Sequence, residues 1–334
     1  MDDRRGGAQA LPRSGPTPVL PVTPVHPAPI PGRSAGRPVL WSLVLALRPR
    51  QWTKNAIVLA GLIFGERLLD PASLADAALA FAIFCLLSGV VYIVNDVRDR
   101  DADRLHPIKS RRPIAAGDVS VATALAFGAG LAACALAAAY WLSVEFGNVG
   151  LTYLALLIVY SIWLKHLVIL DVITLALGFV LRAWGGAAAV GVDMSHWLLL
   201  LALLLALFLA LSKRRAELVG LADDARHHRP ILAEYSENLL DQMISVVTAS
   251  TLLAYALYTI DAETVARFGT DRLVWTLPFP LYGIFRYLYL VHRKDGGGNP
   301  SEILLSDRPI LVCVALWGAA IILLVYGPRL TPAG

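Results

Sequence analysis

The chain alternates between long apolar runs and short polar segments, and this pattern predicts membrane-spanning helices. A helix needs about 20 mainly apolar residues to cross the hydrocarbon core of a bilayer. Of the 334 residues, 57% are hydrophobic and 16% are charged, and the mean hydropathy is +0.62. We therefore expect an all-α polytopic membrane protein, a bundle of about nine transmembrane helices. The expected spans lie near residues 52–68, 72–95, 118–141, 148–164, 169–191, 196–212, 238–260, 272–291 and 308–327.

Basic residues gather in alternate loops between these runs, and this asymmetry predicts the orientation of the chain. Six lysines and arginines follow the second span and five follow the sixth, with one after the fourth (Lys165) and two after the eighth (Arg293 and Lys294). The loops on the other side carry only Arg67, Arg267, Arg272 and Arg329. Cytoplasmic loops carry the excess of positive charge, so we expect the N-terminus and the long polar loops in the cytoplasm. The chain is thus predicted to be a multi-pass protein of the cell (inner) membrane.

The first 38 residues differ from the remainder because they are rich in proline and show no apolar period. Such a segment cannot bury enough apolar surface to fold alone. We expect residues 1–38 to form a disordered cytoplasmic tail and residues 39–330 to form a single transmembrane domain.

Several classes of function are excluded by what the sequence lacks. It shows no Ser/His/Asp set, no zinc-ligand spacing and no nucleotide-binding glycine loop. The net charge of +4 does not indicate nucleic acid, because the basic residues lie in loops between spans. The cysteines lie in apolar runs without paired spacing, so neither a disulfide nor a metal site is expected from Cys85, Cys134 and Cys313.

The end of the second predicted span carries a stripe of oxygen-bearing side chains. Asn95, Asp99 and Asp103 recur every four residues, so a continuing helix would place them on one face. Carboxylates on adjacent turns repel one another, and hard oxygen ligands of this kind suit Mg²⁺ together with substrate phosphates. The alternative is a solvated helix end whose aspartates pair with neighbouring arginines. A basic loop directly after the stripe favours the metal.

That loop contains Lys109 and Arg112 between Pro107 and Pro113. The two prolines discourage a continuous helix, so the loop is expected to fold over the end of the second span. Its cations would neutralise a diphosphate, although ordinary enrichment of basic residues in a cytoplasmic loop explains them equally well.

A second polar group, at the cytoplasmic end of the sixth span, contains Lys213, Arg214 and Glu217. Lys213 and Glu217 are four residues apart and could simply form an ion pair along the helix. Alternatively, the two cations hold phosphate while Glu217 supplies an oxygen to a metal or to a ribose hydroxyl. The predicted topology places this group on the same side of the membrane as the acidic stripe.

Charged residues also occur within the predicted spans, where charge is costly and usually faces the interior of the bundle. Asp171 and Arg182 bracket the first half of the fifth span, and Arg286 lies inside the eighth. The two arginines are candidates for contacts with phosphate, and the alternative is a structural pair with a nearby carboxylate. The glycines 89, 185 and 186 are expected to allow close packing of helices.

The stretch after the second span has a specific spacing, Asn95-Asp96-x-x-Asp99-x-x-x-Asp103, followed by Lys109, Arg112-Pro113 and Gly117. It resembles the first signature of the UbiA family of intramembrane prenyltransferases, and the resemblance covers about residues 45–327. Family members are all-helical bundles of nine spans around a cavity. Two acidic motifs at the cytoplasmic ends of their second and sixth spans bind Mg²⁺ and a diphosphate.

The second motif departs from the common family pattern. An aromatic prenyltransferase usually has Asp-x-x-x-Asp there, whereas this chain has Lys213 and Glu217 at the corresponding ends. In this it is similar to the branch of decaprenyl-phosphate phosphoribosyltransferases. Other segments match that branch as well: 48–55, 94–99, 106–117, 165–166, 181–183, Tyr235 and 307–308.

This resemblance implies a reaction and a set of roles. The donor would be phosphoribosyl pyrophosphate, the acceptor a polyprenyl (decaprenyl) phosphate, the cofactor Mg²⁺, and the product a precursor of cell-envelope polysaccharide. By this resemblance, Asn95, Asp99 and Asp103 would bind Mg²⁺ and the donor diphosphate, and Asp96 would lie beside them. The residues that would bind phosphate groups are Lys54, Lys109, Arg112, Arg182, Lys213 and Arg214. Gln51 and Glu217 would orient the ribose, and Tyr235 would cover the site. Asp99, Asp103, Lys54, Lys213 and Glu217 are the expected catalytic residues.

Two other functions are weighed against this one. The first is a prenyltransferase that moves a prenyl chain onto an aromatic acceptor for quinone or haem synthesis, which the basic second motif disfavours. The second is a polytopic transporter or lipid-carrier binding protein, but its ionisable residues would be expected at the bilayer midplane. The length of the polyprenyl chain and the oligomeric state, a homo-oligomer included, are left open by the sequence.

Overall fold

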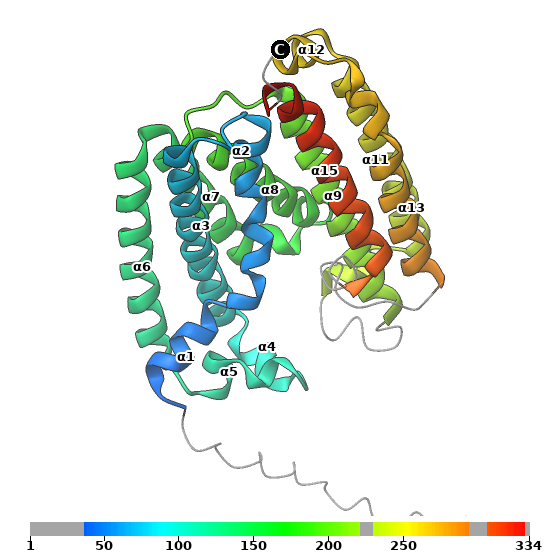
Figure 1. The fold of residues 1–334 in the computed structure, drawn as a ribbon. Helices are drawn as coiled ribbons and strands as arrows, with labels where there is room; N and C mark the ends of the chain where they lie inside the picture. The colour runs from blue at the N-terminus through cyan, green and yellow to red at the C-terminus, as the bar shows by residue number, and fades with distance from the viewer. Residues whose placement is uncertain (1–36, 221–229, 294–305, 331–334) are drawn as a thin grey trace, which may run out of the picture. The chain divides into compact units, whose positions relative to one another are not determined.

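The structure is a computed structural model that describes residues 37–220, 230–293 and 306–330. Residues 1–36 of the predicted tail lie outside this range. The described residues form helices and no strand (Figure 1), which agrees with the predicted all-α class. In chain order the elements are α1 Val39–Ala46, η1 Pro49–Leu59, α2 Ala60–Phe64, α3 Pro71–Arg98, α4 Arg100–Leu105, η2 Lys109–Arg111, α5 Pro113–Ala116, α6 Val121–Leu142, α7 Val144–Ile162, η3 Leu164–His166, α8 Leu170–Ala189, α9 His196–Gly220, η4 Pro230–Glu234, α11 Glu237–Ile260, α12 Ala262–Phe268, η5 Arg272–Thr276, α13 Pro278–Arg293 and α15 Arg308–Leu330, where η marks a 3₁₀ helix.

Seven of the described helices are long and apolar enough to cross a membrane. They are α3, α6, α7, α8, α9, α11 and α15. The predicted spans 52–68 and 272–291 are not among them, because the first consists of η1 and the five-residue α2, and the second of η5 and the 16-residue α13. The predicted count of nine is therefore not confirmed in the part of the chain that the structure describes.

Polar side chains set where the long helices begin. Asp70 accepts hydrogen bonds from the backbone N–H groups of Ala72 and Ser73 and so caps the N-terminus of α3. The Ser73 hydroxyl also donates to Asp70, and these bonds lower the pKa of the Asp70 carboxyl. Ser120, Ser143 and Ser236 cap α6, α7 and α11 in the same manner. Each cap satisfies an amide that has no partner within its helix.

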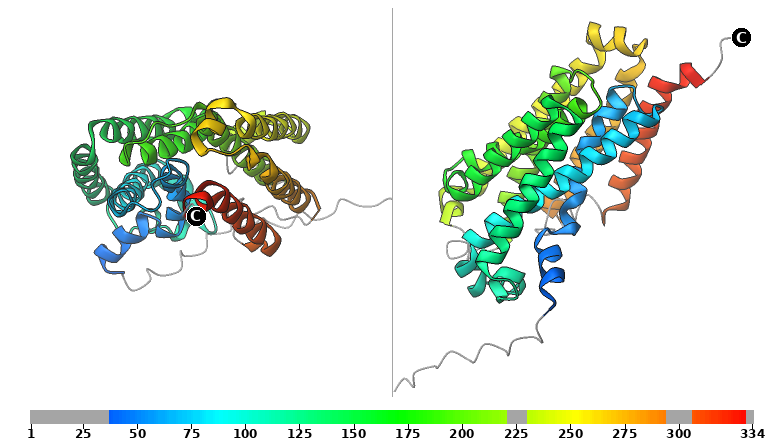
Figure 2. Two further views of the ribbon diagram at one scale, coloured as in Figure 1. Left: turned by 45° about the horizontal axis from the view of Figure 1, so that its top comes forward. Right: turned by 90° about the vertical axis from the view of Figure 1, so that its left-hand side faces the viewer.

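Aromatic side chains fill the spaces between neighbouring helices. Phe84 of α3 contacts Phe146 and Tyr153 of α7 edge to face, with ring centroids 5.7 and 5.3 Å apart. Phe208 of α9 and Tyr287 of α13 form a similar pair at 5.1 Å within a second buried cluster. The left view of Figure 2 shows the red α15 between the blue N-terminal segments and the orange α13. The core is thus built both from contacts between consecutive helices and from contacts between segments far apart in the chain, such as Val58 of η1 with Ala188 of α8.

The glycines predicted to allow close packing do so. A Cβ atom at Gly185 would lie 2.5 Å from the ring of Phe84, and one at Gly89 would lie 2.7 Å from the Leu47 side chain. At Gly186 it would lie 1.8 Å from the carbonyl oxygen of Val58. The backbone of α8 therefore touches the backbone of η1, and this contact positions the polar residues of η1 beside the other helices.

The thiols of Cys85 and Cys313 are buried among the helices, and Cys134 is exposed on α6.

Candidate active site

The acidic stripe lies where α3 passes into α4. The helix is interrupted at Asp99, yet its hydrogen bonds continue, because the Asp99 N–H donates to the Asn95 carbonyl over 2.9 Å and the Asp103 N–H donates to the Asp99 carbonyl over 2.8 Å. The Asn95 side chain donates to Asp99 Oδ2 over 2.9 Å. The three residues therefore follow one another on successive turns, as their spacing predicts.

A basic loop covers two of the carboxylates. One guanidinium nitrogen of Arg112, Nη1, lies 3.1 Å from Asp96 Oδ1 and 2.6 Å from Asp103 Oδ2. The two carboxylates are almost fully buried, with 2% and 5% of their side chains exposed. Asp96 and Asp103 are seven residues apart, which places them on one face over two turns. Arg112 compensates the repulsion that would otherwise separate them.

The predicted folding of the loop over the second span is confirmed by these contacts. Arg112 is in extended conformation immediately before Pro113, which starts the short helix α5. Lys109 lies one turn earlier in η2, and its carbonyl accepts the Arg112 N–H over 2.9 Å.

Arg48 contacts the same cluster from the N-terminal side. Its guanidinium forms an ion pair with Asp96, and it also stacks over the ring of Tyr92, 4.9 Å from the centroid. Its backbone is left-handed, with φ 53°, an unfavourable conformation for a residue with a long side chain. Strain of this kind is kept where surrounding contacts hold it, and here the contacts are those of the acidic cluster.

Asp99 is the most exposed of the three aspartates and has a different cation. Lys165, from η3, forms an ion pair with Asp99 Oδ1, and the exposed fractions of the two side chains are 12% and 34%. Lys165 and Arg48 were not predicted as site residues, although both lie in segments that match the phosphoribosyltransferase branch. Pairing between segments that far apart has no local signature in the sequence.

The oxygen donors of this cluster suit a hard cation such as Mg²⁺. Within the described ranges, however, no group of three or more histidine, cysteine or acidic side chains is close enough to hold a metal alone. Each buried carboxylate is also shared with a protein cation. The oxygen donors of the cluster therefore fit Mg²⁺ only as an ion that takes most of its ligands from a bound diphosphate.

The second motif is built around a buried arginine. Arg214 of α9 donates through Nε to Asp171 Oδ2 over 2.7 Å and through Nη1 to Glu217 Oε2 over 2.9 Å. The side chains of Asp171 and Arg214 are 0% and 2% exposed, whereas Glu217 is 26% exposed. Arg214 was predicted to grip phosphate, but its guanidinium is engaged by two carboxylates. Its evident effect is to hold Glu217 in place.

Tyr235 completes this network from the end of η4. Its hydroxyl donates to Asp171 Oδ1 and accepts the Ile169 N–H, both over 2.8 Å. Burial and the bond to Asp171 raise the pKa of Tyr235 to about 12, so the phenol is protonated at neutral pH and donates to the carboxylate. Ile169 has a positive φ of 69°, which the hydrogen bond to Tyr235 helps to maintain. Tyr235 was predicted to cover the site and instead anchors Asp171.

Lys213 and Lys54 form the cationic part of the site. Lys213 Nζ lies 3.8 Å from Glu217 Oε1, which is the pair along the helix that the spacing predicts. Lys54 lies half-buried on η1, where the positive charges of Lys213, Arg182 and Arg48 act on it. Gln51 lies one turn earlier on the same segment. Like charges gathered in this way favour a bound polyanion.

Arg182 lies in the interior of the bundle. It donates to Asn55 Oδ1 over 2.8 Å, to the Tyr153 hydroxyl over 2.7 Å and to the Gly178 carbonyl over 3.2 Å. Its guanidinium also stacks over the Tyr153 ring at 4.8 Å. These neutral acceptors satisfy the hydrogen bonds of the cation without cancelling its charge, so Arg182 adds to the positive potential around Lys54.

The second arginine considered from the sequence has a structural role. Arg286 Nη2 lies 3.0 Å from Asp307 Oδ2. Arg286 thus forms a structural ion pair, which the sequence left open as the alternative to a contact with phosphate.

Comparison with known proteins agrees with this architecture. Residues 54–303 match the UbiA prenyltransferase family. The chain belongs to this family. The match includes both polar motifs and every helix from α3 to α13.

Two curated relatives that match most of the chain share one name. The chain is 34% identical over 292 residues to a protein of Corynebacterium glutamicum named decaprenyl-phosphate phosphoribosyltransferase, covering 85% of this chain and 86% of that protein. It is 33% identical over 311 residues to the protein of the same name from Mycolicibacterium smegmatis, covering 86% and 95%.

A solved structure shares the fold. The UbiA homologue of Archaeoglobus fulgidus bound to GPP and Mg²⁺ superimposes with a TM-score of 0.66 at 23% identity, over 85% of this chain and 99% of that one.

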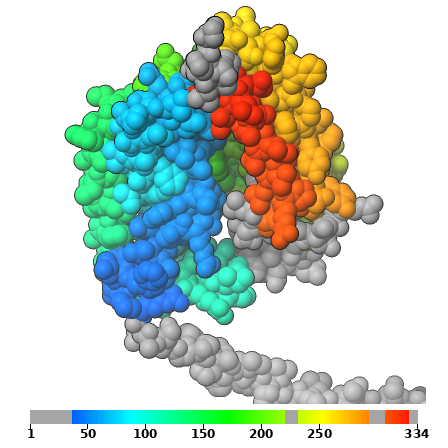
Figure 3. All heavy atoms as spheres, in the orientation of Figure 1, coloured from blue at the N-terminus to red at the C-terminus, as the bar shows by residue number. Residues whose placement is uncertain are grey.

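The UbiA bundle is hollowed on one face. Figure 3 shows the hollow between the blue segments η1 and α2 and the red α15, with green atoms from the middle of the chain at its floor. At one end it is bridged by Tyr326 of α15, whose hydroxyl donates to the Leu62 and Ile63 carbonyls over 3.3 and 3.2 Å and accepts the Leu68 N–H over 3.4 Å.

Proposed function

We propose that this chain catalyses Mg²⁺-dependent transfer of the 5-phosphoribosyl group from phosphoribosyl pyrophosphate to a polyprenyl phosphate, decaprenyl phosphate by analogy with the curated relatives. Pyrophosphate is released, and the lipid product would serve the synthesis of cell-envelope polysaccharide. The relatives named for this reaction, 33–34% identical over most of the chain, support the substrate pair.

The observation that carries the proposal is the composition of the second motif. Its buried residue is Arg214, and the two carboxylates around it, Asp171 and Glu217, are both bonded to that cation. A second acidic metal site, as used with prenyl diphosphates in the family, has no place in this arrangement. A donor that carries a sugar next to its diphosphate can instead use Glu217 for a ribose hydroxyl and Lys213 for a phosphate.

The reaction forms one bond and breaks one. A phosphate oxygen of the polyprenyl phosphate attacks the anomeric carbon of the ribose, and the bond from that carbon to the pyrophosphate oxygen breaks, with its electron pair leaving on pyrophosphate. The nucleophile is already anionic at neutral pH, so the site needs no general base. The site needs to stabilise the departing charge and to orient the two substrates.

The residues divide these tasks. Lys54, Lys109 and Lys213 contact phosphate groups, and Arg112 holds Asp96 and Asp103 in place. Arg182 adds positive potential from the interior, and Gln51 with Glu217 orients the ribose. Mg²⁺, held with the donor diphosphate by Asn95, Asp99 and Asp103, would supply charge neutralisation for the leaving pyrophosphate. The hollow beside α15 would accept the isoprenoid chain.

The site is proposed to face the cytoplasm, because the basic loops lie at its end of the helices. Phosphoribosyl pyrophosphate is a highly charged, water-soluble donor, and this orientation would make it accessible without transport across the membrane.

The decisive test uses membranes that contain the protein. They are incubated with radiolabelled phosphoribosyl pyrophosphate, polyprenyl phosphate and Mg²⁺, and the lipid is extracted into organic solvent. We expect label in the lipid phase that is lost with EDTA and with Asp103→Ala. The matched control is Asp101→Ala, because Asp101 is 79% exposed and, among the described residues, pairs with Arg100 and Arg104 at the surface. The control should retain activity.

The opposite result is equally clear. No label in the lipid phase, together with transfer of a prenyl diphosphate onto an aromatic acid by the same membranes, would assign the chain to the aromatic prenyltransferases.

A further inference from the structure

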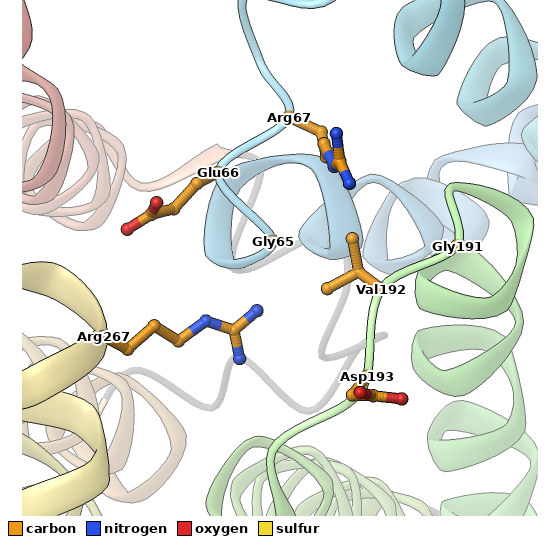
Figure 4. Close-up of a pocket in the computed structure, with 7 residues that line it drawn as sticks. All are labelled: Gly65, Glu66, Arg67, Gly191, Val192, Asp193 and Arg267. Carbon is orange, nitrogen blue, oxygen red and sulfur yellow. The ribbon is translucent and has the colours of Figure 1, made fainter.

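A second polar site lies at the end of the bundle opposite the acidic motif. It consists of a cavity of about 490 Å³ between the turn from α2 to α3, the connection from α8 to α9, and α12. Its lining includes Arg67, Val192, Asp193 and Arg267 (Figure 4). The 28 residues of α3 separate this end from the acidic motif by about 42 Å, at 1.5 Å per residue. None of these residues takes part in the proposed transfer.

The cavity is cationic where its side chains converge. In Figure 4 the Arg67 and Arg267 side chains extend towards the space from two different segments, whereas the carboxylates of Glu66 and Asp193, which also line the cavity, are directed away from the space between the two arginines. Among the residues that the structure describes, no side-chain hydrogen bond or ion pair engages either arginine. Two guanidinium groups repel one another, and a phosphate between them would replace repulsion with charge-assisted hydrogen bonds.

An aromatic cavity of about 210 Å³ adjoins the cationic one and shares Asp193 and Arg267 with it. Its lining includes the aromatic residues Phe64, Tyr258 and Phe268 and the aliphatic Leu198. The polar residues Ser195, His196, Glu263 and Thr264 also line it. Tyr258 is only 3% exposed, and within the described ranges its hydroxyl has no hydrogen-bond partner. Buried hydroxyl groups are rarely left in this state, and the missing partner is accounted for when a ligand occupies the cavity.

The position of the two cavities indicates a lipid. Exposed tryptophans at the same end of the bundle, Trp141 at the end of α6 and Trp275 in η5, are typical of the headgroup level of a membrane. A cationic cavity next to an aromatic one, at that level, matches an amphiphile with a phosphate beside its chains. We propose that this end of the protein binds the phosphate of a membrane lipid, with Arg67 and Arg267 on the phosphate and Tyr258 beside the adjoining part of the molecule.

The proposal is tested by equilibrium binding of radiolabelled dioctanoyl phosphatidic acid to the full-length protein in detergent. We expect saturable binding that Arg67→Gln and Arg267→Gln each weaken about tenfold, the effect of losing one hydrogen bond to a charged group. Tyr258→Phe should weaken it several-fold. Arg272→Gln is the matched control, because Arg272 is exposed at the same end but does not line either cavity. Circular dichroism verifies that each variant is folded.

Two competitors separate the possible ligands. Dioctanoylglycerol has the same chains without phosphate and should not compete, and inorganic phosphate should compete at least about tenfold more weakly than the lipid. Equal binding by wild type and both arginine variants would overturn the site. Competition by inorganic phosphate as strong as that by the lipid would overturn the lipid assignment, and equal competition by dioctanoylglycerol would overturn the role of phosphate.

Discussion

The guanidinium of Arg214 donates to the carboxylate of Asp171 over 2.7 Å, although the two residues are 43 positions apart on neighbouring helices. Neither side chain is more than 2% exposed. A buried pair of this kind contributes little net stability compared with apolar residues of the same size. Removing one partner is different, because the other charge is left buried without compensation.

We therefore expect Asp171→Asn to destabilise the protein by about 3 kcal/mol. The variant leaves Arg214 with Glu217 as its remaining anionic partner in the described structure, and it weakens the hydrogen bond from Tyr235. The measurement is the loss of helical circular dichroism as denaturing detergent is added to the protein in micelles.

The matched control uses the ion pair of the next residue of α9, Arg215, with a carboxylate of α11. Arg215 pairs with Asp241, which is 38% exposed, so Asp241→Asn should cost less than about 1 kcal/mol. Equal destabilisation by the two variants would contradict the view that burial decides the effect.

Arg112 is predicted to be essential because one of its nitrogens contacts both Asp96 and Asp103. Arg112→Gln leaves Asp103 without its cation and Asp96 with Arg48 alone, and it removes a cation from the phosphate site. We expect kcat/KM for the phosphoribosyl donor to fall by about 100-fold, equivalent to about 2.7 kcal/mol of transition-state stabilisation. Initial rates of lipid labelling at varied donor concentration measure this quantity.

Arg111→Gln is the control for that variant, because Arg111 is the adjacent residue and its side chain is exposed. Its kcat/KM should stay within about twofold of wild type, a change of less than about 0.5 kcal/mol. A similar loss in both variants would mean that the loop contributes only its overall charge.

Much of the fold and the first motif was predictable because both rest on local patterns. Seven apolar runs of sufficient length are seven helices, and the spacing of Asn95, Asp99 and Asp103 survives the break between α3 and α4. The break itself was not predictable. Asp99 is drawn towards Lys165, which comes from a segment 66 residues away.

The irregular segment η1 has a similar cause. Its sequence reads as the start of an apolar span, but Asn55 is held by Ser88 of α3 and by Arg182 of α8. Side chains of two other helices thus satisfy the hydrogen-bonding groups of Asn55. Irregular backbone such as that of η1 is tolerated within a membrane protein when its polar groups are bonded to protein in this way. The pairing of Asp171 with Arg214 could not be predicted from the sequence either. Which helices become neighbours is a property of the whole bundle and has no local pattern.

The orientation of the chain predicts which loops are accessible from each side. Ser110 lies in the basic loop and Thr270 at the opposite end, between α12 and η5. In intact cells, Ser110→Cys should resist a membrane-impermeant maleimide until the membrane is opened, whereas Thr270→Cys should react at once. The background is the wild-type chain with its three cysteines, all inside apolar helices. The reverse pattern would place the motif outside and contradict the proposed cytoplasmic site.

The contact between α8 and η1 offers a test of how the polar residues of η1 are held. A Cβ atom at Gly186 would lie 1.8 Å from the Val58 carbonyl oxygen and 2.6 Å from its carbon, and both are backbone atoms that cannot move aside alone. Gly186→Ala should therefore push η1 away from α8, and with it Lys54 and Asn55. We expect a destabilisation of about 1–3 kcal/mol together with a raised KM for the donor, because overpacking forces the backbone to shift.

Gly130→Ala is the matched control, since it makes the same change in the transmembrane helix α6 with no atom within 4 Å of the new methyl group. It should leave KM unchanged and stabilise the helix by up to about 1 kcal/mol, because alanine has the higher helix propensity. Detergent unfolding and donor kinetics on both variants separate the two effects. A normal KM in Gly186→Ala would show that Lys54 does not depend on this contact for its position.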